Sequence, residues 1–258
     1  MNEQNIFSEV TLLITVYNRS RSLERLLAAF ENLNVRFGEI IVSDDCSRPE
    51  HIKAIRDLQA KYAFNLITTP VNRGLGHNIN KGQDAVETPF TLYVQEDFVP
   101  RNIFPACLHE AVRHMHGNGE LDMVRFYSYF KFPYLKPVNG ELSEMLFDTT
   151  FAGYKKFYMY SDHPHLRRSN FLSKFGRYKE GANIDVTEYR MMISFLQKKG
   201  KAFYYENHKD IFDQLNSPDE PSSFKRDFWR ESNNVIVSSV RHIYRYVKFR
   251  LDYSFRKN

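Results

Sequence analysis

Two adjacent carboxylates, Glu96 and Asp97, follow directly after a run of strand-forming residues. A second acidic pair, Asp44 and Asp45, follows another apolar run. A carboxylate at the end of a buried strand adds little to core packing, but it can bind a divalent cation or accept charge-assisted hydrogen bonds from a ligand. The alternatives are a solvated turn for the first pair and helix capping for the second.

The segments that position these carboxylates alternate between strand and helix patterns. Four apolar runs predict strands, at 11–16, 39–43, 65–69 and 90–94. Helical spacing between them is found at Leu23, Leu26, Leu27 and Phe30, at Ile52, Ile55, Leu58 and Tyr62, and from about Gly76 to Glu87. This order predicts an α/β fold with a doubly wound, mostly parallel sheet.

Polar residues follow each of the four predicted strands. They are Tyr17-Asn18-Arg19-Ser20, Asp44-Asp45-Cys46-Ser47, Val71-Asn72-Arg73-Gly74 and Gln95-Glu96-Asp97. In open α/β sheets, ligands bind at the carboxyl ends of the strands. The sequence therefore predicts a polar cleft along one edge of the sheet.

The composition is typical of a globular protein, which we expect to be cytoplasmic with reduced cysteines. The 258 residues are 42% hydrophobic and 26% charged, which suffices for one large or two small domains. No apolar run approaches the roughly 20 residues of a membrane span, and residues 1–9 lack a secretory pattern. Neither the two cysteines nor the near-match HEAVRH at 109–114 has the spacing of a zinc site.

Four motifs, in register, resemble the family 2 glycosyltransferases of the GT-A fold. They are ITVYNRS (14–20), IIVSDDCS (40–47), NRGLGHNINKG (72–82) and LYVQEDFVP (92–100). The first is similar to the family's opening strand and loop, the second to VVDDGS, the third to its N.G.s.aRN.g pattern and the fourth to its Asp-x-Asp motif. The resemblance runs from 11 to about 208. It implies an inverting enzyme that passes a sugar from a nucleotide-sugar donor to an acceptor hydroxyl.

The resemblance also implies a divalent metal, Mn²⁺ or Mg²⁺, which would neutralise the charge on the leaving diphosphate. Asp97 takes the position of the family's metal-binding acid, and Glu96 stands at the middle of that motif. Gln95 replaces its first Asp and brings no charge. His208 follows a strand-like run, where the family often supplies a late metal or phosphate ligand. Asp97 and His208 are therefore the expected metal ligands.

Nine residues are expected to contact the nucleotide through the same resemblance: Thr15, Tyr17, Asn18, Asp44, Asp45, Arg73, Asn78, Gln95 and Glu96. Asp44 and Asp45 match the family's paired acids, which hold the base and ribose, and the resemblance favours a UDP-linked donor. The alternative is that this segment caps a helix. Ser47 would be the N-cap, Pro49 a first-turn proline and Glu50 the capping-box acid.

The glycines Gly74 and Gly76 follow a predicted strand and open a predicted helix, as in a dinucleotide fingerprint. The third glycine of that fingerprint is missing, because Ile79 stands in its place. We interpret the pair as loop glycines, with Arg73 and Asn78 near the diphosphate. A purely structural loop is the alternative.

An inverting transferase needs a base that removes the acceptor proton. The family places this acid at the start of a helix in the second half, where Glu188 opens the helical pattern 187–200, and Asp185 is the second candidate. Tyr189 stands where the family often has Asp. The alternative is structural, since Asp185 and Glu188 also have the spacing of an N-cap and its capping-box partner.

Three regions follow: a nucleotide-sugar-binding half (1–100), an acceptor-binding half of the same domain (101–215) and a basic helical tail (216–258). Residues 225–258 hold nine Lys/Arg against three acids, which argues against a nucleic-acid surface on the body. The tail has an apolar stripe of Ile236, Val240, Ile243, Val247 and Leu251. This stripe predicts either docking on the body or peripheral contact with the anionic inner face of the plasma membrane.

The expected acceptor is a saccharide or a lipid-linked sugar, in bacterial cell-surface polysaccharide synthesis. Two other functions stay open. A sugar-nucleotide pyrophosphorylase shares this architecture, although 17–25 lacks the glycine of its phosphate loop. A catalytically inactive nucleotide-binding or membrane-docking protein would agree with Gln95 and Tyr189.

Overall fold

A computed structural model describes residues 5–216, 220 and 235–255, with side chains in the last segment from Val240 onward. The strands are β1 Asn5–Val16, β2 Val35–Asp44, β3 Asn65–Ile67, β4 Phe90–Gln95, β5 Phe98–Pro100, β6 Met123–Arg125, β7 Leu135–Asn139, β8 Leu142–Met145, β9 His165–Arg168, β10 Ala202–Tyr205 and β11 Phe212–Gln214. The helices are α1 Ser20–Asn32, α2 Pro49–Tyr62, α3 Leu75–Asp84, α4 Phe104–Gly117, α5 Phe171–Phe175, α6 Ile184–Gln197 and α8 Val235–Phe255, with 3-10 turns η1 Lys155–Phe157 and η2 His208–Asp210.

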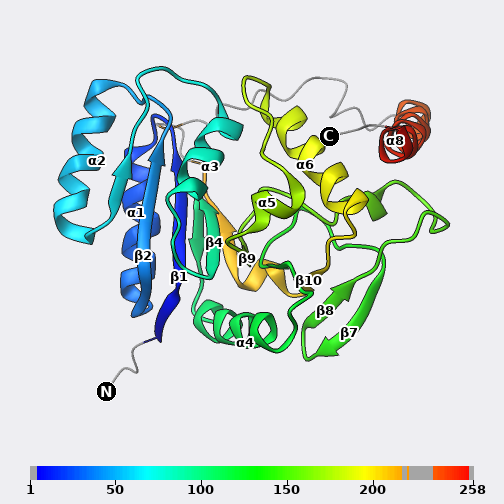
Figure 1. The fold of residues 1–258 in the computed structure, drawn as a ribbon, viewed down its shortest axis with the longest axis horizontal. Coiled ribbons are helices and arrows are strands. Elements are labelled where there is room, and N and C mark those ends of the chain that lie inside the picture. Colours follow the sequence, from blue (N-terminus) through cyan, green and yellow to red (C-terminus); the bar gives the residue numbers. More distant parts are fainter. Residues whose placement is uncertain (1–4, 217–219, 221–234, 256–258) are drawn as a thin grey trace.

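Nine of these strands form one sheet in the order β3-β2-β1-β4-β9-β6-β10-β8-β7 (Figure 1). The strands β3, β2, β1 and β4 are parallel to one another, and β9 is inserted antiparallel between β4 and β6. The predicted α/β fold with a mostly parallel sheet is confirmed. The short strands β5 and β11 form a separate antiparallel ribbon.

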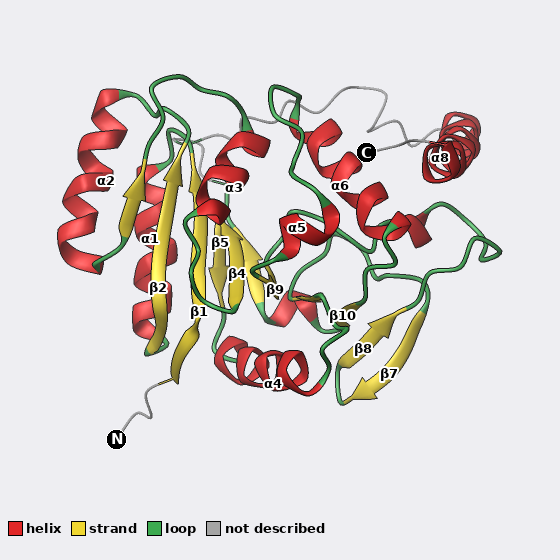
Figure 2. Cartoon of the chain, in the orientation of Figure 1, coloured by secondary structure: helices red, strands yellow, loops and turns green. Residues whose placement is uncertain are grey.

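Helices cover both faces of the sheet, which gives the three layers visible in Figure 2. One core packs the sheet against α1, α2 and α4, and includes Leu26, Ile55 and Leu108. The other packs it against α3, α5 and α6, and includes Ile79, Phe171 and Ile193. Burial on both faces explains why β1 and β4 have continuous apolar runs and no alternating pattern.

The start of α6 corrects one prediction. Asn183, and not Asp185, is the N-cap, since its side chain accepts a 2.9 Å hydrogen bond from the backbone N–H of Val186. The helix therefore begins at Ile184, three residues before the predicted start, and Asp185 lies in its first turn. Asn and Asp cap equally well, so composition does not distinguish them.

The predicted tail helix is present as α8, but its predicted docking face is not the one that packs. Val240, Ile243, Val247 and Leu251 are exposed, whereas Phe249 is buried against the body. The side chain of Ile236 lies outside the described residues. The prediction that this aliphatic stripe docks is therefore wrong for the part that the structure describes.

Candidate active site

The register of the sheet brings the polar strand ends to one edge. Val16 pairs with Asp44, and Thr15 pairs with Gln95, so β1, β2 and β4 end level with one another. Because β9 is antiparallel to β4 and β6, its first residue, His165, lies beside the ends of both strands. This edge therefore collects residues from both halves of the chain.

Asp97 begins the ribbon at this edge and is almost completely buried. Its Oδ2 accepts a 3.0 Å hydrogen bond from the side chain of Gln214, while its Oδ1 is buried without a hydrogen-bond partner. An unpartnered buried carboxylate oxygen is costly unless something binds it. Asp97 Oδ1 is thus suited to hold a cation.

Glu96 has a different partner from its neighbour. Arg19 donates a 2.9 Å hydrogen bond to Glu96 Oε1, and both side chains are buried. Burial, followed by the charge of Asp97, raises the pKa of Glu96 to about 7, although Arg19 opposes this shift. Glu96 is therefore paired with Arg19, and this pairing competes with metal binding.

His208 closes the same edge from the second half of the chain. Its Nδ1 lies 2.6 Å from the hydroxyl of Tyr204, and its Nε2 is buried without a partner. The Tyr127 ring lies 5.9 Å from the His208 ring, and the pKa of Tyr127 is raised mainly by burial, with a small contribution from the charge of Asp97. Burial lowers the pKa of His208, which favours the neutral imidazole that metals require.

The unpartnered atoms of Asp97 and His208 are each of a type that binds a divalent cation. Within residues 5–216, 220 and 235–255, no cluster of three or more His, Cys, Asp or Glu side chains is arranged to hold one. A metal on these two residues would take its other ligands from phosphate oxygens and water, as Mg²⁺ commonly does.

The two acids after β2 have different surroundings. Asp45 accepts backbone hydrogen bonds from Arg73 (3.1 Å) and Gly74 (2.7 Å), so its carboxylate holds the loop before α3. Asp44 Oδ2 accepts from the backbone of Ser47, but its Oδ1 is buried and has no partner. Asp44 therefore keeps an oxygen for a ligand, whereas Asp45 is mainly committed to the loop.

The predicted capping by Ser47 is wrong. The N-cap of α2 is Arg48, without a side-chain hydrogen bond, and Ser47 instead accepts a 2.7 Å bond from the backbone N–H of Asn18. Pro49 does occupy the first turn, followed by the acidic Glu50. Asn18 also accepts from the backbone of Arg48 at 2.8 Å, so it joins the loop after β1 to the loop after β2.

Thr15 and Tyr17 flank this junction. Thr15 is buried and its hydroxyl lies 3.0 Å from that of Tyr93, while Tyr17 and Gln95 are only partly buried. Tyr17 and Gln95 therefore reach the surface of the edge, and Thr15 lies beneath it.

Asn78 and Arg73, expected near a diphosphate, have partners within the protein. Asn78 is buried, accepts from Ser43 Oγ at 2.7 Å and donates to the Val16 carbonyl. Arg73 is exposed and pairs with Glu180 at 2.9 Å. Asn78 thus fixes α3 to the sheet, and Arg73 joins the loop before α3 to the loop before α6.

The glycine pair has a structural explanation. Gly74 has a φ of +84°, which few other residues adopt, and its N–H reaches Asp45. A Cβ on Gly76 would lie 2.3 Å from the carbonyl oxygen of Lys179, so only glycine lets α3 approach the segment before α6. These glycines bring the amino ends of α3 and α6 together.

Glu188 lies in the first turns of α6 and faces a second carboxyl group. The backbone N–H of Asp162 donates to Glu188 Oε1 at 3.3 Å. Burial and the charge of Asp162 raise the pKa of Glu188 to about 8, and Asp185 adds a smaller contribution. Tyr189 points away, because its hydroxyl bonds to Asp252 of α8 at 2.5 Å.

Asp162 is a functional candidate that the sequence did not reveal. It is buried, its Oδ1 accepts from Tyr160 at 2.5 Å, and its Oδ2 has no partner. Burial raises its pKa to about 6. Arg125, also missed, donates to the Tyr158 carbonyl and to Ser161, and so orders the segment that carries Asp162. No periodicity in this Tyr- and Phe-rich region marks either residue.

A strap of residues 212–216 with Glu220 runs back over the first helix. Leu215 donates its N–H to the Asp97 carbonyl at 2.8 Å, and Arg19 donates to the Asn216 side chain at 3.0 Å. Glu220 accepts from the backbone N–H groups of Arg21 and Ser22 at the start of α1, both at 2.9 Å. The strap thereby contacts Arg19, the backbone of Asp97 and the start of α1.

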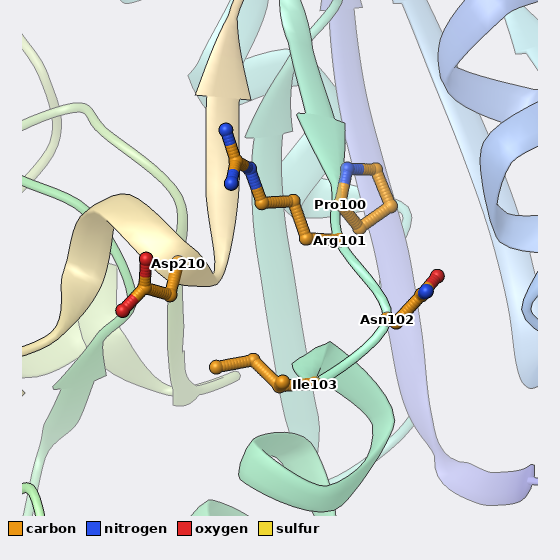
Figure 3. A pocket seen from close by; sticks show the side chains of 5 residues that line it. All are labelled: Pro100, Arg101, Asn102, Ile103 and Asp210. Atoms are coloured by element: carbon orange, nitrogen blue, oxygen red, sulfur yellow. The ribbon is translucent and has the colours of Figure 1, made fainter.

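The surface hollow in Figure 3 lies at the far end of β5 from Asp97. Its lining is Pro100, Arg101, Asn102, Ile103 and Asp210. Arg101 there is paired with Asp213 at 2.7 Å. The hollow brings together none of the predicted site residues.

Comparison with solved structures places this architecture among the GT-A glycosyltransferases. Residues 1–349 of TarS from S. aureus, in complex with UDP-GlcNAc, are 14% identical, with a TM-score of 0.59 over 97% of this chain and 76% of that chain. The structure of the same protein with UDP is 14% identical to this chain, and its TM-score is 0.57 over 96% of this chain and 72% of that chain. The mannosyltransferase PcManGT from Pyrobaculum calidifontis, in complex with GDP-Man and Mn²⁺, is 13% identical, with a TM-score of 0.53 over 94% of this chain and 64% of that chain.

The solved structures show the fold, and the sequence itself shows the family. The model of the glycosyl transferase family 2 matches residues 11–176, more than half of the chain. The chain therefore belongs to glycosyl transferase family 2. No curated protein sequence matches it.

Proposed function

We propose that this glycosyltransferase passes a sugar from a nucleotide-sugar donor to an acceptor hydroxyl with inversion. The observation that carries the proposal is the pair of unpartnered buried atoms, Asp97 Oδ1 and His208 Nε2, at the edge where Glu188 and Asp162 also meet. Asp97 and His208 are suited to hold a cation, and Glu188 is suited to accept a proton. A metal-dependent inverting transferase would use the cation for the leaving diphosphate and the base for the acceptor hydroxyl.

Asp97 and His208 would hold Mn²⁺ or Mg²⁺, and the ion would supply positive charge to the leaving diphosphate. Arg19 lies 3.6 Å from Asp97 Oδ2 and partly balances the acidic turn. Arg19 thereby neutralises Glu96, which adds to the loss of negative charge at Gln95 and leaves Asp97 as the acid of this turn that would hold the metal.

The nucleotide would lie over the ends of β1 and β2, with Asp44 Oδ1 accepting from the base or ribose. Tyr17 would flank the base, while Asn18 and Asp45 hold the two loops in place. Bound UDP-GlcNAc and UDP in the TarS structures support a UDP-linked donor. Under this proposal, 1–100 binds the donor and 101–215 shapes the acceptor site.

Glu188 would remove the proton from the acceptor hydroxyl as the sugar is attacked from the opposite side. Asp162 orients Glu188 through its backbone N–H, and Asp185 is the alternative base. A saccharide or lipid-linked acceptor, in bacterial surface polysaccharide synthesis at the cytoplasmic side, is the context we propose.

Release of nucleoside diphosphate from a panel of UDP- and GDP-sugars, with Mn²⁺, Mg²⁺ or chelator, tests the proposal. We expect metal-stimulated release from one UDP-sugar and its loss in Asp97→Asn. The anomeric configuration of the product, read by NMR, tests inversion. A retained configuration, or release that is equal in Asp97→Asn and the native protein, contradicts the proposal. Formation of a nucleotide sugar from nucleoside triphosphate would instead indicate the pyrophosphorylase.

A further inference from the structure

The helix α8 lies at one end of the molecule (Figure 1), and aromatic side chains of α8 contact the body. The Phe249 ring packs 5.6 Å from Phe157 and 5.1 Å from Tyr189, and Tyr253 packs 5.2 Å from Phe147. Gln197 of α6 also donates to the Tyr253 carbonyl at 2.8 Å. These contacts fix which side of α8 faces outward.

The opposite side, here named the outer face, is apolar and exposed. Its residues are Val240 (62% exposed), Ile243 (65%), Tyr244 (63%), Val247 (49%), Leu251 (53%) and Phe255 (79%). At about 100° per residue, these positions fall within one third of the helix surface. Large apolar side chains gathered on one exposed face commonly mark an interaction surface.

Basic side chains flank the outer face on both sides. Arg250 lies along one margin and Arg241 along the other, whereas Lys248 is engaged with the body, 3.7 Å from the Tyr189 ring. The only carboxylate in α8, Asp252, is turned to the body, where it accepts from Tyr189 at 2.5 Å and from Lys248 at 2.9 Å. The outer face therefore combines apolar surface with the basic side chains of Arg241 and Arg250 at its margins.

We infer that the outer face of α8 docks on the surface of an anionic phospholipid bilayer. Aliphatic and aromatic side chains would enter the boundary between headgroups and acyl chains, and the flanking Arg241 and Arg250 would lie at the phosphates. Among the described residues, no helix is long and apolar enough to cross a membrane, so the contact is peripheral. A second copy of the chain fits less well, because pairing two outer faces would bring their basic margins together.

This inference does not depend on the enzymatic activity, and its test measures binding alone. The full chain is co-sedimented with vesicles of phosphatidylcholine, with and without phosphatidylglycerol. We expect binding to the anionic vesicles that weakens as salt is raised. The variant Ile243→Gln/Val247→Gln/Leu251→Gln should lower the partition coefficient about tenfold, because it replaces three of the six apolar side chains of the outer face. Its stability should not change, since all three side chains are exposed.

The matched control is Ile6→Gln/Val71→Gln/Val138→Gln, which changes three exposed apolar residues of the body. It should bind vesicles as the native protein does, and Arg250→Gln should weaken binding only at low salt. Equal binding by both triple variants overturns the inference, as does absence of native binding at low salt. A native dimer in sedimentation velocity that the α8 variant loses would assign the face to a second copy instead.

Discussion

Arg19 lies between two adjacent carboxylates and forms ion pairs with both, but it donates a hydrogen bond only to Glu96: its Nη1 lies 2.9 Å from Glu96 Oε1 and 3.6 Å from Asp97 Oδ2. The pair is buried, so its charges are only weakly screened by solvent. Asp97 Oδ1 has no hydrogen-bond partner and can accept a ligand, whereas Glu96 Oε1 is already bonded to Arg19. Two neighbouring acids in one turn thus have separate roles.

We expect Asp97→Asn and Glu96→Gln to differ in metal-dependent nucleotide binding. Asp97→Asn should lose it, because the amide brings no charge to a cation. Glu96→Gln should retain it, because Gln can still accept from Arg19. Thermal shift with UDP, with and without Mn²⁺, measures both, since a ligand stabilises the native state according to its affinity. Equal responses from the two variants would contradict the division of roles.

Removing only one member of the Arg19–Glu96 pair should destabilise the protein strongly. Arg19→Met leaves two buried carboxylates without a cation, and we expect the free energy of unfolding to fall by about 3–5 kcal/mol. The double variant Arg19→Met/Glu96→Met should recover most of this loss. Urea denaturation of the two variants measures the difference. A double variant no more stable than Arg19→Met would show that the pair is not the main cause.

Asp44 and Asp45 should separate nucleotide affinity from stability. Asp45→Asn retains only one acceptor oxygen for two backbone donors, so we expect unfolding to become easier by about 1–3 kcal/mol. Asp44→Asn can still accept from Ser47, so its stability should change little. Its UDP affinity should fall by roughly 1–3 kcal/mol, the scale of a lost charge-assisted bond. Calorimetric titration with UDP gives the affinity, and the reverse pattern would exchange the two roles.

Glu188→Gln should bind the donor and lose turnover, because an amide cannot take a proton. In the native enzyme, kcat/KM should rise with pH through about 8, where Glu188 loses its proton. Asp162→Asn removes the charge that opposes this ionisation, so the rise should move to lower pH. A profile that is unchanged by Asp162→Asn would limit Asp162 to a structural role. Normal turnover in Glu188→Gln with loss in Asp185→Asn would make Asp185 the base.

The raised pKa of Glu188 also predicts how stability depends on pH. The folded protein holds this proton more tightly than the unfolded chain does, whose Glu pKa is near 4.5, so stability is lost as pH rises through about 8. Glu188→Gln removes this dependence. At about pH 9 the variant should be more stable than the native protein by roughly 1–3 kcal/mol, and at about pH 4 the two should be alike. Urea denaturation at both pH values measures it.

The sequence predicted those features that depend on local pattern. The strand end at Asp97 and the order of the first four strands follow from apolar runs and from the residues that interrupt them. Asp162 could not be found this way, because only the antiparallel insertion of β9 brings its segment beside β4. The face of α8 that packs on the body was predicted wrongly, because the prediction relied on the spacing of aliphatic residues and not on the larger surface of the aromatic ones. In the structure, Phe249 and Tyr253 pack against the body, since their rings can bury more surface.

The strap has a practical consequence for protein engineering. A shortened chain that ends before Phe212 would appear to remove only an appendage, yet it would also remove Gln214, which holds Asp97 Oδ2, and Asn216, which holds Arg19. Such a protein would keep every strand of the nine-stranded sheet. It would also lose Phe212, which is buried in the core against Phe98 and Phe104, so an inactive product would not show that the tail itself takes part in the chemistry. Shortened versions should therefore retain the chain through Glu220.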